Sequence, residues 1–255
     1  MLAKDAERTG MRRCRLCWVK EDEQSASSLE KHIEENPENS ELRYQLAAKY
    51  IVLTRYNEAY AAARKAIELG MDNARGYGML GRACVESGRL DEAYESSLKA
   101  FKLDSNNPMS SINLGIYYSL RGNFEMAMDY FDIAARLAPS SHRLFAERGL
   151  HYARVGMIHE ALADLREAIN LQPCNQDYYH NMSDIYISNH NPEEAKKVLD
   201  MSIQAKPGCA ESHFALSQIF LSEGNREEAL LHIRKAVELS PGNEEYLETL
   251  KTIDG

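Results

Sequence analysis

Small and bulky hydrophobic residues recur along this chain at a fixed interval of 34 residues, with polar stretches between them. Six consecutive blocks run without a gap to Asn243, and they begin at Ser40, Ala74, Pro108, His142, Gln176 and Ala210. A period of this length is typical of arrays whose unit is a pair of helices joined by a turn. The pattern therefore predicts two antiparallel helices in each block.

Two columns of small residues indicate where the helices of a block lie close together. The column in the second helix contains only alanine: Ala59, Ala93, Ala127, Ala161, Ala195 and Ala229. The column midway along the first helix holds Ala47, Gly81, Gly115, Gly149, Ser183 and Ser217. Small side chains at both positions allow two helix axes to approach closely. Bulky apolar residues fill the neighbouring columns, except that Arg148 stands where the other blocks have Leu or Met. Its charge needs a partner or a route to solvent.

The predicted ends of the helices carry matching turn residues. Four glycines follow first helices, at positions where only glycine adopts a left-handed backbone without a steric penalty: Gly88, Gly122, Gly156 and Gly224. Four prolines follow second helices and stop them: Pro139, Pro173, Pro207 and Pro241.

This order of small and large residues resembles the tetratricopeptide repeat and extends over residues 40–243. The resemblance implies an all-α fold, a right-handed superhelical solenoid of antiparallel helix pairs whose first helices line a concave face. The repeats would be residues 40–73, 74–107, 108–141, 142–175, 176–209 and 210–243. The chain departs from the family pattern because no block has a Trp near its start, and Met71 and Ser105 replace two of the closing prolines.

The two ends of the array are expected to differ from the repeats, because terminal repeats need polar caps. Residues 244–255 read as a C-terminal capping helix with Tyr246, Leu247, Leu250 and Ile253 on one face. Residues 27–39 read as an N-terminal capping helix, and residues 1–26 as a flexible tail.

Composition and charge exclude several classes of function. The formal net charge of -9 disfavours non-specific binding of nucleic acid, which requires clustered Lys and Arg. No apolar run approaches the ~20 residues of a membrane helix, and no secretory signal follows Met1 or Met11. Five cysteines, an odd number, indicate reduced thiols. We therefore expect a soluble, cytoplasmic protein without stable membrane insertion.

Motifs with chemical meaning are weak. Residues 76–81, GYGMLG, match a dinucleotide fingerprint, but a helix and not a strand precedes them, and Gly81 belongs to the small-residue column. Cys14 and Cys17 form one C-x-x-C pair, whereas a closed zinc site needs four ligands. The two thiols are therefore expected to be incidental. A metal shared across a dimer and a regulatory disulfide are the alternatives. We predict no enzymatic activity and no cofactor.

The resemblance points to capture of a protein or peptide segment in the concave face. The expected contact residues are Met79, Arg82, Asn113, Ile116, Leu120, Arg143, Leu150, Arg154 and Asn181. The family's carboxylate clamp is incomplete, because Gly78 and Glu147 occupy two of its basic positions, and only Asn113 and Asn181 stand in the column of an asparagine ladder. The leading hypothesis is a scaffold or adaptor. The alternatives are an assembly chaperone or pilotin-like factor for a secretion, pilus or organelle system, and a substrate-recruiting subunit of an enzyme complex. Self-association stays open.

Overall fold

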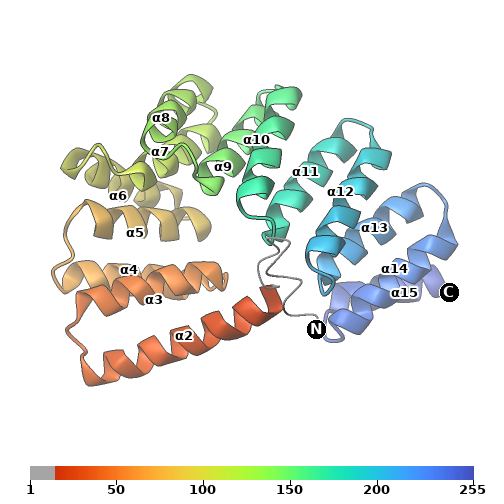
Figure 1. Cartoon of the computed structure of the whole chain (residues 1–255), viewed down its shortest axis with the longest axis horizontal. Coiled ribbons are helices and arrows are strands. Elements are labelled where there is room, and N and C mark those ends of the chain that lie inside the picture. Colours follow the sequence, from red (N-terminus) through yellow and green to blue (C-terminus); the bar gives the residue numbers. More distant parts are fainter. Residues whose placement is uncertain (1–14) are drawn as a thin grey trace, which may run out of the picture. The chain divides into compact units, whose positions relative to one another are not determined.

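The computed structural model describes residues 15–255, with side chains from residue 22 onward. Every regular element in this part of the chain is an α-helix, labelled α2 to α15 in Figure 1, and these residues contain no strand. The expectation of an all-α fold built from helix pairs is confirmed.

The first helix of every predicted repeat begins at the first residue of its block and is 13 residues long. These helices are α3 (Ser40–Val52), α5 (Ala74–Glu86), α7 (Pro108–Leu120), α9 (His142–Arg154), α11 (Gln176–Ser188) and α13 (Ala210–Ser222). The second helices are α4 (Tyr56–Glu68), α6 (Leu90–Leu103), α8 (Phe124–Leu137), α10 (Ile158–Leu171), α12 (Pro192–Ala205) and α14 (Arg226–Leu239).

A column of capping residues sets the starting points of five of the six first helices and of α15, whereas Cys209 before α13 makes no side-chain cap bond. The side chain before each of six helices accepts a hydrogen bond from a backbone N–H in the first turn: Asn39, Asn73, Asn107, Ser141, Asn175 and Asn243. An Asn or Ser cap is worth about 1 kcal/mol to a helix. The column recurs with the same period as the small residues, so it fixes the register of the blocks.

The turn after each first helix adopts a left-handed backbone. Gly88, Gly122, Gly156 and Gly224 have φ between 74° and 81°, as their positions predicted. Thr54 and His190 occupy the equivalent turns with φ of 58° and 57°. A residue with a Cβ pays a steric penalty in this region, so these two turns are strained.

Small residues permit close helix packing, as the sequence predicted. A Cβ on Gly115 of α7 would lie 2.7 Å from the Phe131 ring of α8, and one on Gly81 of α5 would lie 2.2 Å from Ser97 Oγ of α6. Neither distance leaves room for a methyl group, so both helix pairs depend on the glycine.

The N-terminal helix is longer than predicted. Helix α2 spans Arg15–Glu35, so residues 15–26, expected as part of a flexible tail, are helical. The sequence has no Gly or Pro between residues 11 and 36 to end the helix, and Ala26 and Ile33 are buried in the core. Polar contacts with α3 add to this anchoring: Lys49 pairs with Asp22 at 2.6 Å, and the Tyr50 hydroxyl donates to Glu30 at 2.6 Å. At the other end, α15 (Glu244–Asp254) buries Tyr246 and Ile253 against α13 and α14 as a capping helix.

The chain divides into two compact units, residues 17–157 and residues 158–255. The boundary falls between α9 and α10, inside the fourth block, which was expected to be a continuous repeat. This is the block in which Arg148 replaces the apolar residue of the first helix. The Arg148 guanidinium lies over the rings of Phe145 and Tyr152, 5.6 and 5.8 Å from their centroids, both on α9 itself.

Candidate functional site

The expected contact residues lie at corresponding positions of the first helices. We use the term first-helix face for the second, fifth, sixth, ninth, twelfth and thirteenth residues of each such helix, counted from the start of the block, and continue the same count into α15. In the unit of residues 17–157 this face is carried by α3, α5, α7 and α9. In the unit of residues 158–255 it is carried by α11, α13 and α15. Asn181 belongs to the second unit, whereas the other eight expected residues belong to the first.

Burial separates these eight residues into two groups. Met79, Asn113 and Ile116 are only 2%, 1% and 5% exposed, and Met79 and Ile116 are members of hydrophobic core clusters. A partner cannot reach them on the folded surface. Leu120 is 43% exposed and Arg154 is exposed, while three residues are partly exposed: Arg82, Arg143 and Leu150. Position in the repeat indicates the direction of a side chain but not its depth.

Asn113 connects three successive first helices. Its Nδ2 donates to the Gly78 carbonyl of α5 at 3.1 Å, and its Oδ1 accepts from Arg143 Nη1 of α9 at 3.0 Å. Arg143 also lies 3.7 Å from Glu86 Oε1 of α5. The amide expected to hold a peptide therefore holds the protein together. We call these contacts the Asn113 tie.

A second polar contact holds α9 against α7. The buried Ser119 hydroxyl lies 3.1 Å from His151 Nδ1 and accepts from Arg154 Nη1 at 3.2 Å. The His151 ring packs 5.6 Å from the Phe131 ring. Arg154 is thus anchored at one nitrogen while its side chain stays exposed, which holds the guanidinium in a defined place on the surface.

Charges gather on this face around Glu147. Burial raises the pKa of Glu147; Arg143 acts against this shift, and Glu86 reinforces it. Burial also lowers the pKa of His142, with Arg82 and Arg143 adding to the effect. Of the three residues that match the carboxylate clamp, Asn113 and Arg143 are bound to each other and Arg82 lies 3.9 Å from Glu86. The arrangement is a structural charge network and not a clamp for a free carboxylate.

The first-helix face of residues 158–255 has a different composition. It carries five exposed carboxylates and no Lys or Arg: Asp177, Asp184, Glu211, Glu245 and Glu248. Exposed Ile187 and Leu221 occupy equivalent positions on α11 and α13. Asn181, the expected contact residue in this unit, is half-buried and occupies the sixth position of α11 on the same face. The asparagine-ladder hypothesis therefore has one member in each unit, and the first is used internally.

A buried polar network lies at the junction of α11, α12 and α13. Ser202, which replaces a packing alanine, donates to Gln176 and lies 2.6 Å from the Ser212 hydroxyl. Ser212 also lies 2.9 Å from His180 Nε2 and donates to Cys209 Sγ at 3.2 Å. Ser212 is fully buried, and burial raises the pKa of the Cys209 thiol, so neither group is poised as a nucleophile. The sequence shows that Ser202 replaces a packing alanine, but it does not show which side chains Ser202 contacts.

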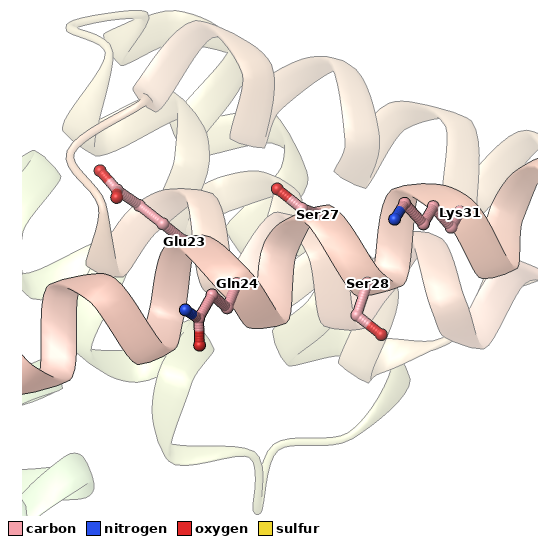
Figure 2. A pocket seen from close by; sticks show the side chains of 5 residues that line it. All are labelled: Glu23, Gln24, Ser27, Ser28 and Lys31. Atoms are coloured by element: carbon pink, nitrogen blue, oxygen red, sulfur yellow. The ribbon is translucent and has the colours of Figure 1, made fainter.

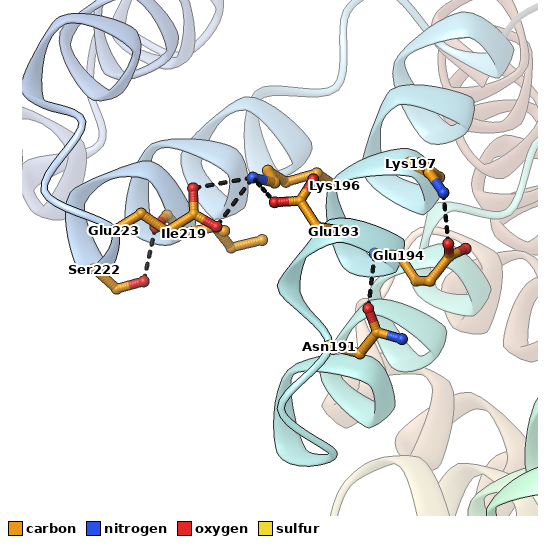
Figure 3. A network of polar contacts seen from close by, with 8 residues as sticks. All are labelled: Asn191, Glu193, Glu194, Lys196, Lys197, Ile219, Ser222 and Glu223. Carbon is orange, nitrogen blue, oxygen red and sulfur yellow. Dashed lines mark hydrogen bonds and ion pairs between the residues drawn. The ribbon is translucent and has the colours of Figure 1, made fainter.

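Two other features of the surface are local. A depression of about 400 Å³ along α2 is lined by Glu23, Gln24, Ser27, Ser28 and Lys31, all from one helix (Figure 2). It has no apolar wall that would bury a ligand. Lys196 of α12 reaches Glu193 at 2.7 Å and Glu223, at the end of α13, at 2.9 Å, so it joins two helices (Figure 3).

The described residues contain no group of three or more His, Cys, Asp or Glu side chains placed to hold a metal ion. None of their helices is long and apolar enough to cross a bilayer. Cys14 lies outside the described residues, and Cys17 falls in the first turn of α2, so the C-x-x-C hypothesis stays a prediction.

Comparison with known proteins agrees with the repeat architecture. Two family models, both described as tetratricopeptide repeat, match residues 74–107 and residues 180–244. No curated protein sequence matches the chain.

Solved structures share the fold at low sequence identity. The human IFIT1 dimer with m7Gppp-AAAA has a TM-score of 0.76 and 18% identity, covering 91% of this chain and 58% of that chain. The APC/C hetero-tetramer Cut9-Hcn1 has a TM-score of 0.67 and 16% identity, covering 92% and 46%. The pilF structure of Pseudomonas aeruginosa has a TM-score of 0.56 and 21% identity, covering 84% and 97%. The chain spans about half the length of the first two. Together with the family models, the 34-residue helix pairs make this chain a tetratricopeptide-repeat protein.

Proposed function

We propose that this tetratricopeptide-repeat protein is a non-enzymatic scaffold that binds a protein segment on the first-helix face of residues 17–157. The observation that carries the proposal is Leu120, a large apolar side chain that is 43% exposed on this face. Leu150 and Arg154 of the adjacent α9 belong to the same face. Leucine and arginine together supply apolar burial and hydrogen-bond donors, the combination found in peptide-binding surfaces.

Rigidity supports this function. The Asn113 tie and the Ser119 contacts hold α5, α7 and α9 together without help from a ligand. A preordered surface leaves most of the ordering cost to the partner, which improves affinity for a given contact area. The internal use of Asn113 is therefore compatible with binding, although Asn113 itself is not a contact residue in this proposal.

The other hypotheses have less support. The likeness to Pseudomonas aeruginosa pilF is one of fold alone, so the assembly-factor role stays a prediction from the sequence. The same is true of the substrate-recruiting subunit. The human IFIT1 dimer was solved with m7Gppp-AAAA, but a net charge of -9 disfavours a polyanionic ligand for this chain.

Substitution of Leu120 tests the proposed face. Leu120→Asp is expected to abolish cross-linking of a partner segment to α7 and α9, mapped by mass spectrometry, with unchanged helical circular dichroism. Leu103→Asp is the matched control, because Leu103 ends α6 in the same unit and is 52% exposed. Ile116 is unsuitable, since a charge at this buried position would unfold the protein. Equal capture by Leu120→Asp and the parent protein would exclude this face.

A further inference from the structure

We propose that the first-helix face of residues 158–255 is a second docking surface, which binds a basic protein segment with apolar residues between its Lys and Arg side chains. This inference rests on the proposed scaffold function and adds a second face with its own partner chemistry. The two faces belong to different units of the chain and are treated separately.

Charge is the first support. Each of α11, α13 and α15 presents at least one exposed carboxylate on this face, and no Lys or Arg occupies any of its positions. The one basic side chain is His180, and burial lowers its pKa against the opposing effect of nearby carboxylates, so its charged form is disfavoured. A partner with Lys or Arg side chains would meet a face of one sign. Such complementarity increases association rates and excludes partners of the wrong sign.

Apolar exposure is the second, independent support. Ile187 and Leu221 are 43% and 39% exposed at equivalent positions of α11 and α13. Phe214 of α13 is half-buried on the same face and packs against Tyr246 of α15, with ring centroids 4.7 Å apart and ring planes tilted by 32°. Ile187 and Leu221 recur at one block position among the carboxylates, so the face offers apolar contacts as well as charge. Apolar anchors framed by charge are typical of a binding surface.

Cations elsewhere in the unit do not neutralise this face. Lys196 is held by Glu193 and Glu223 on the side of α12 and the end of α13 (Figure 3). Lys197 pairs with Glu194 at 2.5 Å. Burial alone would raise the pKa of Glu211, but hydrogen bonds from its own backbone and from Cys209, together with the charge of Lys206 in the connection before α13, lower it. One of the five carboxylates is thus partly engaged within the unit. The remaining negative charge is available to a partner.

The other unit presents a contrasting face. The first-helix face of residues 17–157 carries four arginines and three glutamates: Arg75, Arg82, Arg143, Arg154, Glu41, Glu86 and Glu147. Arg75 pairs with Glu41, and Arg143 lies 3.7 Å from Glu86, so this face is of mixed sign. A basic segment would not meet there the single negative sign that the face of residues 158–255 presents.

A direct binding measurement tests the inference. The probe is a fluorescein-labelled peptide of about 15 residues made of repeated Arg-Leu-Ser units, long enough to occupy an extended binding site. Its counterpart has Glu in place of Arg. We expect the full-length protein to bind the arginine probe with an affinity that falls steeply with salt, and to bind the glutamate probe far more weakly. Failure to bind the arginine probe, or equal binding of both, would overturn the inference.

Paired variants locate the site. Asp184→Asn with Glu248→Gln is expected to weaken binding of the arginine probe about 3- to 10-fold, and Leu221→Ser should weaken it further. Asp200→Asn with Glu227→Gln is the matched control, because it removes the same charge from second helices α12 and α14. Equal effects of the two pairs would indicate a general charge effect and would reject this face. Leu120→Asp should leave probe binding unchanged, so failure of this inference is distinguishable from failure of the proposed scaffold face.

Discussion

Replacement of Asn113 by alanine provides the sharpest test of how the first unit is built. Asn113 is 1% exposed, and its amide bonds to the Gly78 carbonyl at 3.1 Å and to Arg143 at 3.0 Å. Alanine removes both bonds and leaves a buried carbonyl and a guanidinium without their partner. We therefore expect Asn113→Ala to lower the stability of α5, α7 and α9 and not merely to remove a surface contact.

The magnitude follows from the two bonds. A neutral hydrogen bond contributes about 1 kcal/mol net, and one to a charged group about 1.5–3 kcal/mol. The Arg143 side chain is 11% exposed, so water replaces the lost acceptor poorly. The free energy of unfolding of this region should fall by about 2–4 kcal/mol. Asn181→Ala is the control, because Asn181 holds the same block position in the other unit but is half-buried; we expect a loss below about 1 kcal/mol.

Hydrogen exchange is the appropriate assay, because unfolding of a repeat array need not be a single transition. Amides of α5, α7 and α9 should lose protection in Asn113→Ala, while those of α13 and α14 should not. A double-mutant cycle with Arg143→Met should give a coupling of about 0.5–3 kcal/mol. Unchanged protection with lost partner capture would refute this reasoning and identify Asn113 as a ligand-binding residue.

Two further predictions concern backbone strain and pH. Thr54→Gly should raise the free energy of unfolding by about 0.5–1 kcal/mol in denaturant titrations, because Thr54 adopts a φ of 58° that glycine tolerates. Gly88→Thr at the equivalent turn should lower the free energy of unfolding. Equal stability of both variants would contradict the strain argument. His213 and His232 lie 3.1 Å apart through their Nδ1 atoms, and burial lowers the pKa of both below the ordinary 6.5. As the pH falls, the unfolded chain therefore binds protons before the folded chain does. Amide protection in α13 and α14 should be full above about pH 6.5 and should decline as the pH falls through the folded-state pKa values. His232→Gln should weaken this pH dependence of amide protection, and an unchanged pH dependence would exclude the histidine pair as its source.

Periodicity predicted the helix pairs because small and bulky residues pack at the same positions in every block. Each first helix begins at the first residue of its block, and a capping Asn or Ser precedes five of the six. The N-terminal helix was predicted too short, because it lies outside the repeat pattern. Residues 15–26 are helical because Ala26 is buried, Asp22 pairs with Lys49, and no Gly or Pro interrupts them.

The contact residues could be predicted only in direction. Met79, Ile116 and Leu120 all occupy first-helix-face positions, yet the first two are core residues and the third is exposed. Whether such a side chain is covered depends on the residues of the neighbouring helix. These residues vary from block to block, so the 34-residue period does not predict the burial. Asn113 shows the same limit: an asparagine in a family binding column is equally suited to satisfy a carbonyl of the preceding repeat, and the glycine at residue 78 leaves that carbonyl within reach.

The division into two units gives the charge pattern a physical meaning. Arginines on the first-helix face of residues 17–157 are largely engaged with Glu86, Asn113 and Ser119, and so stabilise their own unit. On the face of residues 158–255, burial raises the pKa of Asp184, so the charged form of this carboxylate costs the free unit stability. A surface adapted to bind an external cation carries charge of this kind. Neutralising Asp184 and Glu248 should therefore stabilise this unit while weakening its capture of the arginine probe, and a loss of stability in that variant would show that the carboxylates serve the fold instead.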